Sequence, residues 1–157
     1  MFSFLKSLFF TPKEISKTIY DSQWGKLTCV YTEEDEFFSW DTLLYFDFQK
    51  QGITFSFFGT VQGPDRTIMN DAAIYVNRIS ELQQLVQSFL SKTYAKEGVD
   101  LNQHYYISDV TFYNDSEVED CEVSIEYDSE RDDYLQKETY LVSVYMKKGE
   151  IVNSDIT

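Results

Sequence analysis

The side chains that could most readily take part in binding or catalysis lie between positions 114 and 133, in the stretch NDSEVEDCEVSIEYDSERDD. This stretch holds ten carboxylates and a single base, Arg131. Carboxylates at such density can bind a divalent cation, act in pairs as general acid and base, or meet a basic partner protein. Each of these uses requires a different spacing, so the spacing of the acids decides among them.

A calcium site is the first interpretation, and it rests on DSERDDYLQKET, residues 128–139. Asp128, Glu130 and Asp132 occupy the first, third and fifth positions of a calcium-binding loop. Asp133 stands where such a loop has glycine, however, and Thr139 stands where it has a bidentate glutamate. Because the two most specific positions do not match, we expect no metal site.

Catalytic residues are also not indicated. His104 is the only histidine, it precedes two tyrosines at the start of a predicted strand, and no nucleophile accompanies it. The chain contains no HExxH, CxxC or GxSxG motif and no glycine-rich phosphate loop. Cys29 and Cys121 fall on the apolar phase of strand-like alternations and are interpreted as small buried hydrophobic residues. We therefore expect a protein that is not an enzyme and that uses no cofactor.

A docking surface for a basic protein is the interpretation that the spacing favours. Apolar residues 121, 123, 125 and 127 alternate with the polar residues 122, 124, 126 and 128, which predicts a strand with an acidic outward face. The alternative is a solvated face that only keeps the sheet edge unpaired. The carboxylates assigned to the candidate surface are Asp115, Glu117, Glu119, Asp120, Glu122, Glu126, Asp128, Glu130, Asp132 and Asp133.

A second acidic segment is predicted to contribute to the same surface. It comprises Glu33, Glu34, Asp35 and Glu36, and it is followed by Phe37, Phe38 and Trp40. Aromatic rings beside carboxylates suit a protein interface, with Trp40 as the proposed anchor, because rings supply apolar area and carboxylates set the register. Ordinary packing of these rings is the alternative.

The distribution of charge limits the class of partner. The net charge is -14, and most of it falls within residues 109–133. A field this negative repels phosphates, so we expect no direct binding to nucleic acid or to an anionic membrane. A basic protein is the complementary partner.

The elements that must position these groups are mainly strands. Period-two alternation predicts strands in WGKLTCVYTEE, YYISDVTFY, CEVSIEY, TYLVSVYM and EIVNSDI, the last two joined by a turn at Gly149. The segment LLYFDFQKQGITFSF predicts a hairpin, in which Gly52 is expected to supply a positive φ.

Residues 70–98 change to helical periodicity. Apolar residues recur at steps of three and four, which predicts one long amphipathic helix starting at Asn70 or Asp71 and ending before Gly98. A break near Asn77 and Arg78 is the alternative, because SELQ resembles a capping box.

The expected fold is a single α+β domain spanning residues 1–157. It consists of a mostly antiparallel sheet packed against one long helix, with a core at 17–157 and a short amphipathic N-terminal helix within 1–12. The leader MFSFLKSLFF is too short to span a membrane and has no secretory cleavage site, so we expect a cytoplasmic protein without a membrane span. Docking of the leader on the domain is favoured over shallow contact with a membrane.

The order of these segments resembles a family. The leader, the strand WGKL, the aromatic hairpin, the helix AAIYVNRISELQQLV and the ending YMKKGEIV are similar to small acidic immunity proteins of polymorphic and type VI secretion toxin systems. The resemblance implies an antitoxin that binds a cognate toxin and occludes its basic active-site cleft. The alternative function is a non-catalytic adaptor or scaffold whose acidic face serves solubility.

Overall fold

The main structural element is a nine-stranded sheet with most strands in chain order. The computed structural model describes residues 12–49, 51–93, 105–113, 121–127 and 140–156. Its first half comprises β1 (Ile15–Asp21), β2 (Gly25–Tyr31), β3 (Phe38–Tyr45), β4 (Gly52–Thr60) and the short β5 (Gly63–Pro64). Two helices follow, α2 (Arg66–Asn77) and α3 (Ile79–Thr93). The second half comprises β6 (Tyr105–Phe112), β7 (Cys121–Tyr127), β8 (Tyr140–Lys147) and β9 (Glu150–Ile156).

The two halves meet at a seam between β4 and β6, the parallel pair in the sheet, whereas the other neighbouring strands pair antiparallel. The seam contains four residue pairs, from Thr54 with Asp109 to Phe57 with Phe112. The ring of Phe112 stacks on Phe57 with centroids 5.7 Å apart and an interplanar angle of 9°. Parallel strands need a long crossover connection, and here α2 and α3 lie within it.

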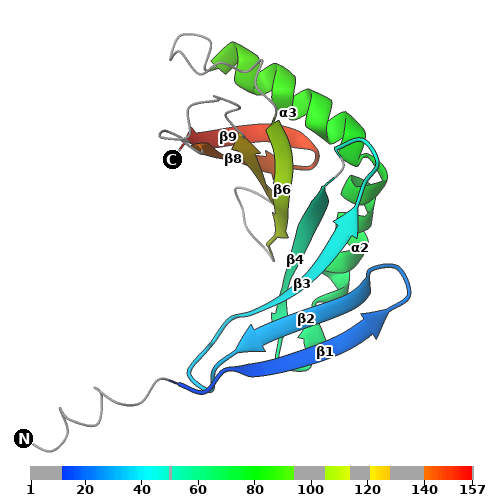
Figure 1. Cartoon of the computed structure of the whole chain (residues 1–157), viewed down its shortest axis with the longest axis vertical. Coiled ribbons are helices and arrows are strands. Elements are labelled where there is room, and N and C mark those ends of the chain that lie inside the picture. The colour runs from blue at the N-terminus through cyan, green and yellow to red at the C-terminus, as the bar shows by residue number, and fades with distance from the viewer. Residues whose placement is uncertain (1–11, 50, 94–104, 114–120, 128–139, 157) are drawn as a thin grey trace, which may run out of the picture.

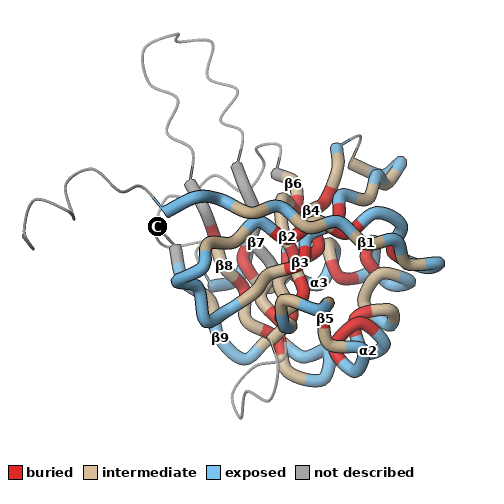
Figure 2. The backbone as a smooth tube through the Cα atoms, turned by 90° about the horizontal axis from the view of Figure 1, so that it is seen from below, coloured by how far each residue is buried: buried red, intermediate tan, exposed pale blue. Residues whose placement is uncertain are grey.

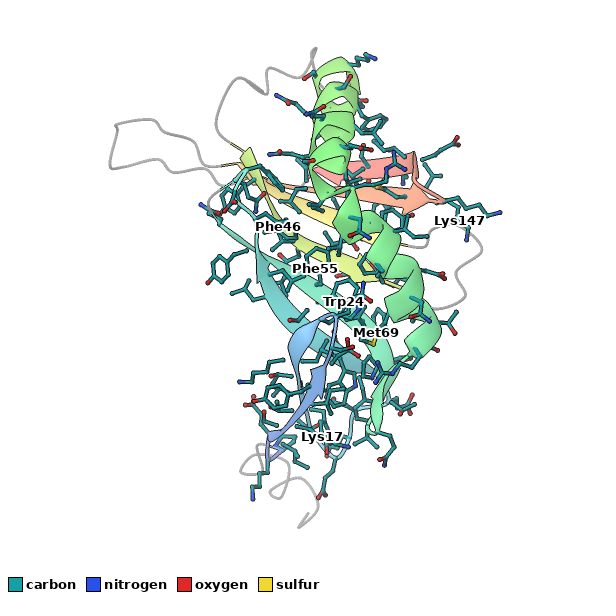
Figure 3. All side chains as sticks on the ribbon, turned by 90° about the vertical axis from the view of Figure 1, so that its right-hand side faces the viewer. Lys17, Trp24, Phe46, Phe55, Met69 and Lys147 are labelled. Carbon is teal, nitrogen blue, oxygen red and sulfur yellow. The ribbon has the colours of Figure 1, made fainter. Side chains whose placement is uncertain are left out.

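Both helices cover one face of the sheet (Figure 1). Their buried residues, Ile68, Met69, Ala72, Ile79, Leu82, Val86 and Leu90, join one core cluster with the inward residues of the strands. Figure 2 shows the buried positions gathered inside the molecule. Trp24 and Phe55 join Met69 of α2 in the core between the sheet and the helices (Figure 3), and Trp24 packs edge-on against Phe57. This face is therefore sealed, whereas no helix of the described residues covers the other face.

The predicted architecture is wrong in two respects. A mostly antiparallel sheet was predicted, whereas the sheet is mixed, because the helical crossover returns the chain parallel to β4. The single long helix is two helices, because the backbone of Arg78 leaves helical geometry and caps α2 by donating to the carbonyls of Tyr75 and Val76. The break near Asn77 and Arg78 that the sequence allowed as an alternative is thus the one observed.

The start of the helical region also differs from the prediction. Asp65, not Asn70 or Asp71, caps α2, and its carboxylate accepts hydrogen bonds from the amides of Thr67 and Ile68. The carboxylate satisfies donors that have no partner within the first helical turn. The predicted N-terminal helix and the helix end near Gly98 lie outside the described residues.

The strand predictions are confirmed where the structure describes them, although β1 and β5 were not predicted. The turn before β9 has positive φ at Lys148 and Gly149, as a tight two-residue hairpin requires. The predicted role of Gly52 is wrong, because this glycine does not have a positive φ. It pairs with Tyr45 at the start of β4, and a Cβ atom there would lie 2.6 Å from the Leu43 side chain.

Candidate partner-binding face

The face of the sheet opposite the helices, here called the open face, carries a continuous polar row. Strand pairing aligns one residue from each of eight strands, because directly paired residues point to the same side of a sheet. The row runs from β1 to β9 through Thr18, Thr28, Asp41, Ser56, Thr111, Glu122, Tyr145 and Asn153. Every member of this row can form hydrogen bonds with a partner or with water.

A neighbouring row on the same face adds two further acids. Its described side chains are Leu43, Thr54, Asp109, Ser143 and Asp155. Asp109 is half-buried at the seam and Asp155 is exposed on the last strand. The open face therefore carries hydroxyl groups over its centre and carboxylates on both halves of the sheet.

Two ion pairs join described residues to one another, and neither involves a carboxylate of this face. Those pairs are Arg66 with Asp21 and Arg78 with Glu81, and none of these four residues belongs to the open face. Asp41 accepts a hydrogen bond from the hydroxyl of Ser39 at 2.8 Å. Glu122 accepts one from the hydroxyl of Tyr113. The same alternation places Lys26 and Lys147 near opposite ends of the face, so its centre remains acidic.

An aromatic groove lies at one end of the open face, where β3 begins and β4 ends. It has a volume of about 760 Å³ and is lined by Phe37, Phe58, Gly59, Thr60, Gly63, Pro64, Asp65 and Tyr113. The rings of Phe58 and Tyr113 stack with centroids 5.5 Å apart. Phe37 is 79% exposed, so its ring is accessible to a partner. The groove thus combines apolar walls with the acids of the adjoining row.

The loop before β3 carries exposed carboxylates at residues 33–36. Asp35 orders this loop, because its carboxylate accepts a hydrogen bond of 2.6 Å from the amide of Thr32. The neighbouring Glu33, Glu34 and Glu36 are exposed to solvent. The loop is followed in the sequence by Phe37, which lines the aromatic groove, so the charged residues adjoin a groove residue along the chain.

The proposed placement of Trp40 as an outward anchor is wrong. Its side chain is fully buried, and its indole nitrogen donates a hydrogen bond of 3.0 Å to the carbonyl of Thr60. Trp40 shares the strand phase of Thr42, which is also buried, so the ring belongs to the core. Phe37 is the exposed ring of this segment.

Most of the predicted acidic stretch lies outside the described residues. This applies to Asp115, Glu117, Glu119, Asp120, Asp128, Glu130, Asp132 and Asp133, and to His104. The backbone of Glu126 belongs to β7, but its side chain is not among those described. Glu122 is the member of the stretch that the structure places, half-buried in the polar row across from Tyr145.

Asp41 and Asp109 were not recognised as candidates from the sequence. Each is a single acid within an otherwise apolar or hydroxyl-rich strand, so no run of charge marks it. The strand phase of Asp41, opposite to that of Thr42, was the available signal for its outward direction. The order of strands across the seam brings Asp41, Asp109 and Glu122 onto one face. Local alternation in the sequence does not reveal this order.

The chemistry open to these groups is recognition. Among the described residues, no group of three histidine, cysteine or acidic side chains is arranged to hold a metal ion. Burial raises the pKa of the Cys29 thiol, and the charges of Asp41 and Asp35 raise it further, so the thiolate form is disfavoured. No helix in the described part of the chain is long and apolar enough to cross a membrane.

Comparisons of the chain with protein-family models, curated proteins and solved structures find no match.

Proposed function

We propose that this protein is a non-catalytic inhibitor that binds a basic protein toxin through the open face of its sheet. The proposal combines the resemblance to immunity proteins with one structural observation. That observation is the polar row, in which Asp41 and Glu122 lie on a face that the helices leave uncovered. Asp109 adds a third carboxylate one row away.

The acidic face favours a cationic partner in two ways. Its field accelerates the approach of a basic surface, and at contact each carboxylate can accept hydrogen bonds from lysine or arginine. Toxins that act on nucleic acid or nucleotides have clefts that receive phosphates, so spaced carboxylates can occupy the same positions. The hydroxyl groups between the acids can donate hydrogen bonds, which adds directional contacts.

A sheet is a suitable carrier for such a surface because its backbone is already ordered before binding. Ser56, Thr111 and Glu122 lie on strands that are paired on both sides. The partner therefore meets groups whose spacing is set by the strand pairing, and little backbone entropy is lost on association. This cost is larger for a flexible acidic tail.

The decisive experiment expresses the protein together with the product of the neighbouring reading frame and measures bacterial growth. We expect the wild-type chain to restore growth. The triple variant Asp41→Asn, Asp109→Asn, Glu122→Gln should fail to restore it, because three carboxylates are lost while the shapes of the side chains are kept. Growth that the wild-type chain does not restore contradicts the proposed function.

A charge-matched control separates a local interface from a general effect of net charge. The variant Glu14→Gln, Asp47→Asn, Asp71→Asn removes the same charge from exposed positions outside both rows. It should protect like the wild type, whereas an equal loss of protection in both triple variants shows that only net charge matters.

With purified proteins, the open-face variant should associate with the toxin about tenfold more slowly than the wild type at low salt. An association rate indifferent to salt favours the adaptor function instead.

A further inference from the structure

We infer that the aromatic groove at Phe37, Phe58 and Tyr113 receives an arginine side chain of the protein partner. This inference rests on the proposed function and names the contact by which the partner is anchored. The groove adjoins the polar row directly, because Tyr113, which lines the groove, donates a hydrogen bond to Glu122, which belongs to the row.

The walls of the groove suit a flat cation. The rings of Phe58 and Tyr113 are inclined by only 24° to each other, so they present neighbouring aromatic surfaces. Phe37, the residue before β3, supplies a third ring to the lining of the groove. A guanidinium group stacks on such faces through cation–π attraction, and it retains donors at its edge for nearby carboxylates.

The charge of the groove has the matching sign. Among the described residues that line the groove, Asp65 carries the only carboxylate, and none is a lysine, arginine or histidine. The hydrogen bond from the Tyr113 hydroxyl to Glu122 places a further negative charge beside the groove and increases electron density on the tyrosine ring. An apolar side chain would use the walls but not these charges, so a cation is the better complement.

Gly59 lets the backbone of β5 pack closely against β4 on one side of the groove. A Cβ atom on Gly59 would lie 2.4 Å from the carbonyl oxygen of Gly63 and 2.6 Å from the Cα atom of Pro64. β4 and β5 therefore approach one another more closely here than any side chain allows. This strand contact fixes the β4–β5 side of the groove.

Arginine is favoured over lysine for a geometric reason. The ammonium group of lysine is compact and strongly hydrated, whereas a guanidinium plane loses little hydration when it lies against a ring. The described lining of the groove offers stacked rings and a single carboxylate, which suits a planar cation more than a point charge.

Peptide titration followed by ¹⁵N–¹H NMR tests the inference on the intact protein. The probes are acetyl-Gly-Arg-Gly-amide, its lysine analogue and its citrulline analogue, which is neutral but nearly isosteric with arginine. We expect the arginine peptide to shift the amide signals of Phe58, Gly59 and Gly63, with binding at least threefold tighter than for citrulline. Equal shifts with citrulline, or shifts elsewhere in the protein, overturn the inference.

Variants connect the groove to the partner. Phe37→Ala should weaken binding of the arginine peptide about threefold, and Tyr113→Phe about twofold, because the second change keeps the ring but removes the hydrogen bond to Glu122. Phe48→Ala, a change of the same type in the β3–β4 turn, should have no effect. In the growth assay, Phe37→Ala should reduce protection and Phe48→Ala should not.

The outcomes distinguish this inference from the proposed function. If the wild-type chain protects cells and Phe37→Ala protects equally well, the groove is not the anchor, although the open face can still bind the toxin. If the wild-type chain gives no protection, the proposed function fails regardless of peptide binding. Protection that is lost in Phe37→Ala, with arginine-selective shifts in the groove, supports both.

Discussion

The carboxamide of Gln49 provides the sharpest test of how the two halves of the sheet are joined. Its nitrogen donates a hydrogen bond of 2.9 Å to the carbonyl of Ile107, and its oxygen accepts one of 3.2 Å from the amide of Ile107. This side chain thus substitutes for a strand neighbour of β6 beyond the last paired residue of the seam, Thr54 with Asp109. Replacing Gln49 by alanine leaves both backbone groups of Ile107 without this partner.

The expected cost follows from the two lost hydrogen bonds. Each contributes about 1 kcal/mol to the free energy of unfolding, and the partly buried backbone groups are only partly resolvated when the partner is removed. We therefore expect Gln49→Ala to destabilise the protein by about 2 kcal/mol, which lowers the melting temperature by roughly 4–8 °C at this chain length. Urea unfolding followed by circular dichroism measures the change.

Two further variants sharpen this test. Gln51→Ala changes the same residue type in the same turn, and its exposed side chain should cost less than about 0.5 kcal/mol. Gln49→Glu keeps an acceptor for the Ile107 amide but sets a carboxylate against the Ile107 carbonyl at neutral pH. Its destabilisation should shrink as acid protonates the carboxylate. Equal stabilities of Gln49→Ala and Gln51→Ala would refute the bridging role.

Three other predictions address the remaining parts of the molecule. Burial raises the pKa of Asp21, but hydrogen bonds from Arg66 and from two backbone amides outweigh burial and hold the pKa below its ordinary value. Asp21→Asn should therefore cost about 1 kcal/mol at pH 7, and the deficit should vanish as the pH falls through the lowered pKa, as denaturant titrations at several pH values will reveal. Gly59→Ala should destabilise by about 2 kcal/mol or more in thermal unfolding, because the new methyl group meets backbone atoms of β5. Cys29 and Cys121 are fully buried, so iodoacetamide should label them only after unfolding, as mass spectrometry can show.

Local patterns in the sequence predict the strands well and the architecture poorly. The alternation around Leu27 and Cys29 reflects burial of one strand face, and both side chains are fully buried. The parallel seam depends on contacts between Phe57 and Phe112, which are far apart in the chain, and no local pattern specifies them. The helix break was likewise underestimated, because the apolar periodicity continues across Arg78 while the backbone does not.

The candidate site, too, could be predicted from local sequence patterns only in part. The charge run led to Glu122, because acids in a run are conspicuous in any sequence. Asp41 and Asp109 became visible only through the strand order that sets them on one face. Trp40 was misplaced because it follows an acidic loop in the chain, whereas its strand phase turns the ring into the core.

The arrangement of strands in chain order also affects how the molecule assembles. Every neighbouring pair except β4 with β6 is formed by strands that follow one another along the chain, so each hairpin can nucleate locally. The two halves of the sheet, β1–β5 and β6–β9, can pair only after the long segment between Phe57 and Phe112 has brought β4 and β6 together. We expect this encounter to set the folding rate, so that trimming the Phe112 ring slows refolding, whereas trimming a hairpin residue mainly speeds unfolding.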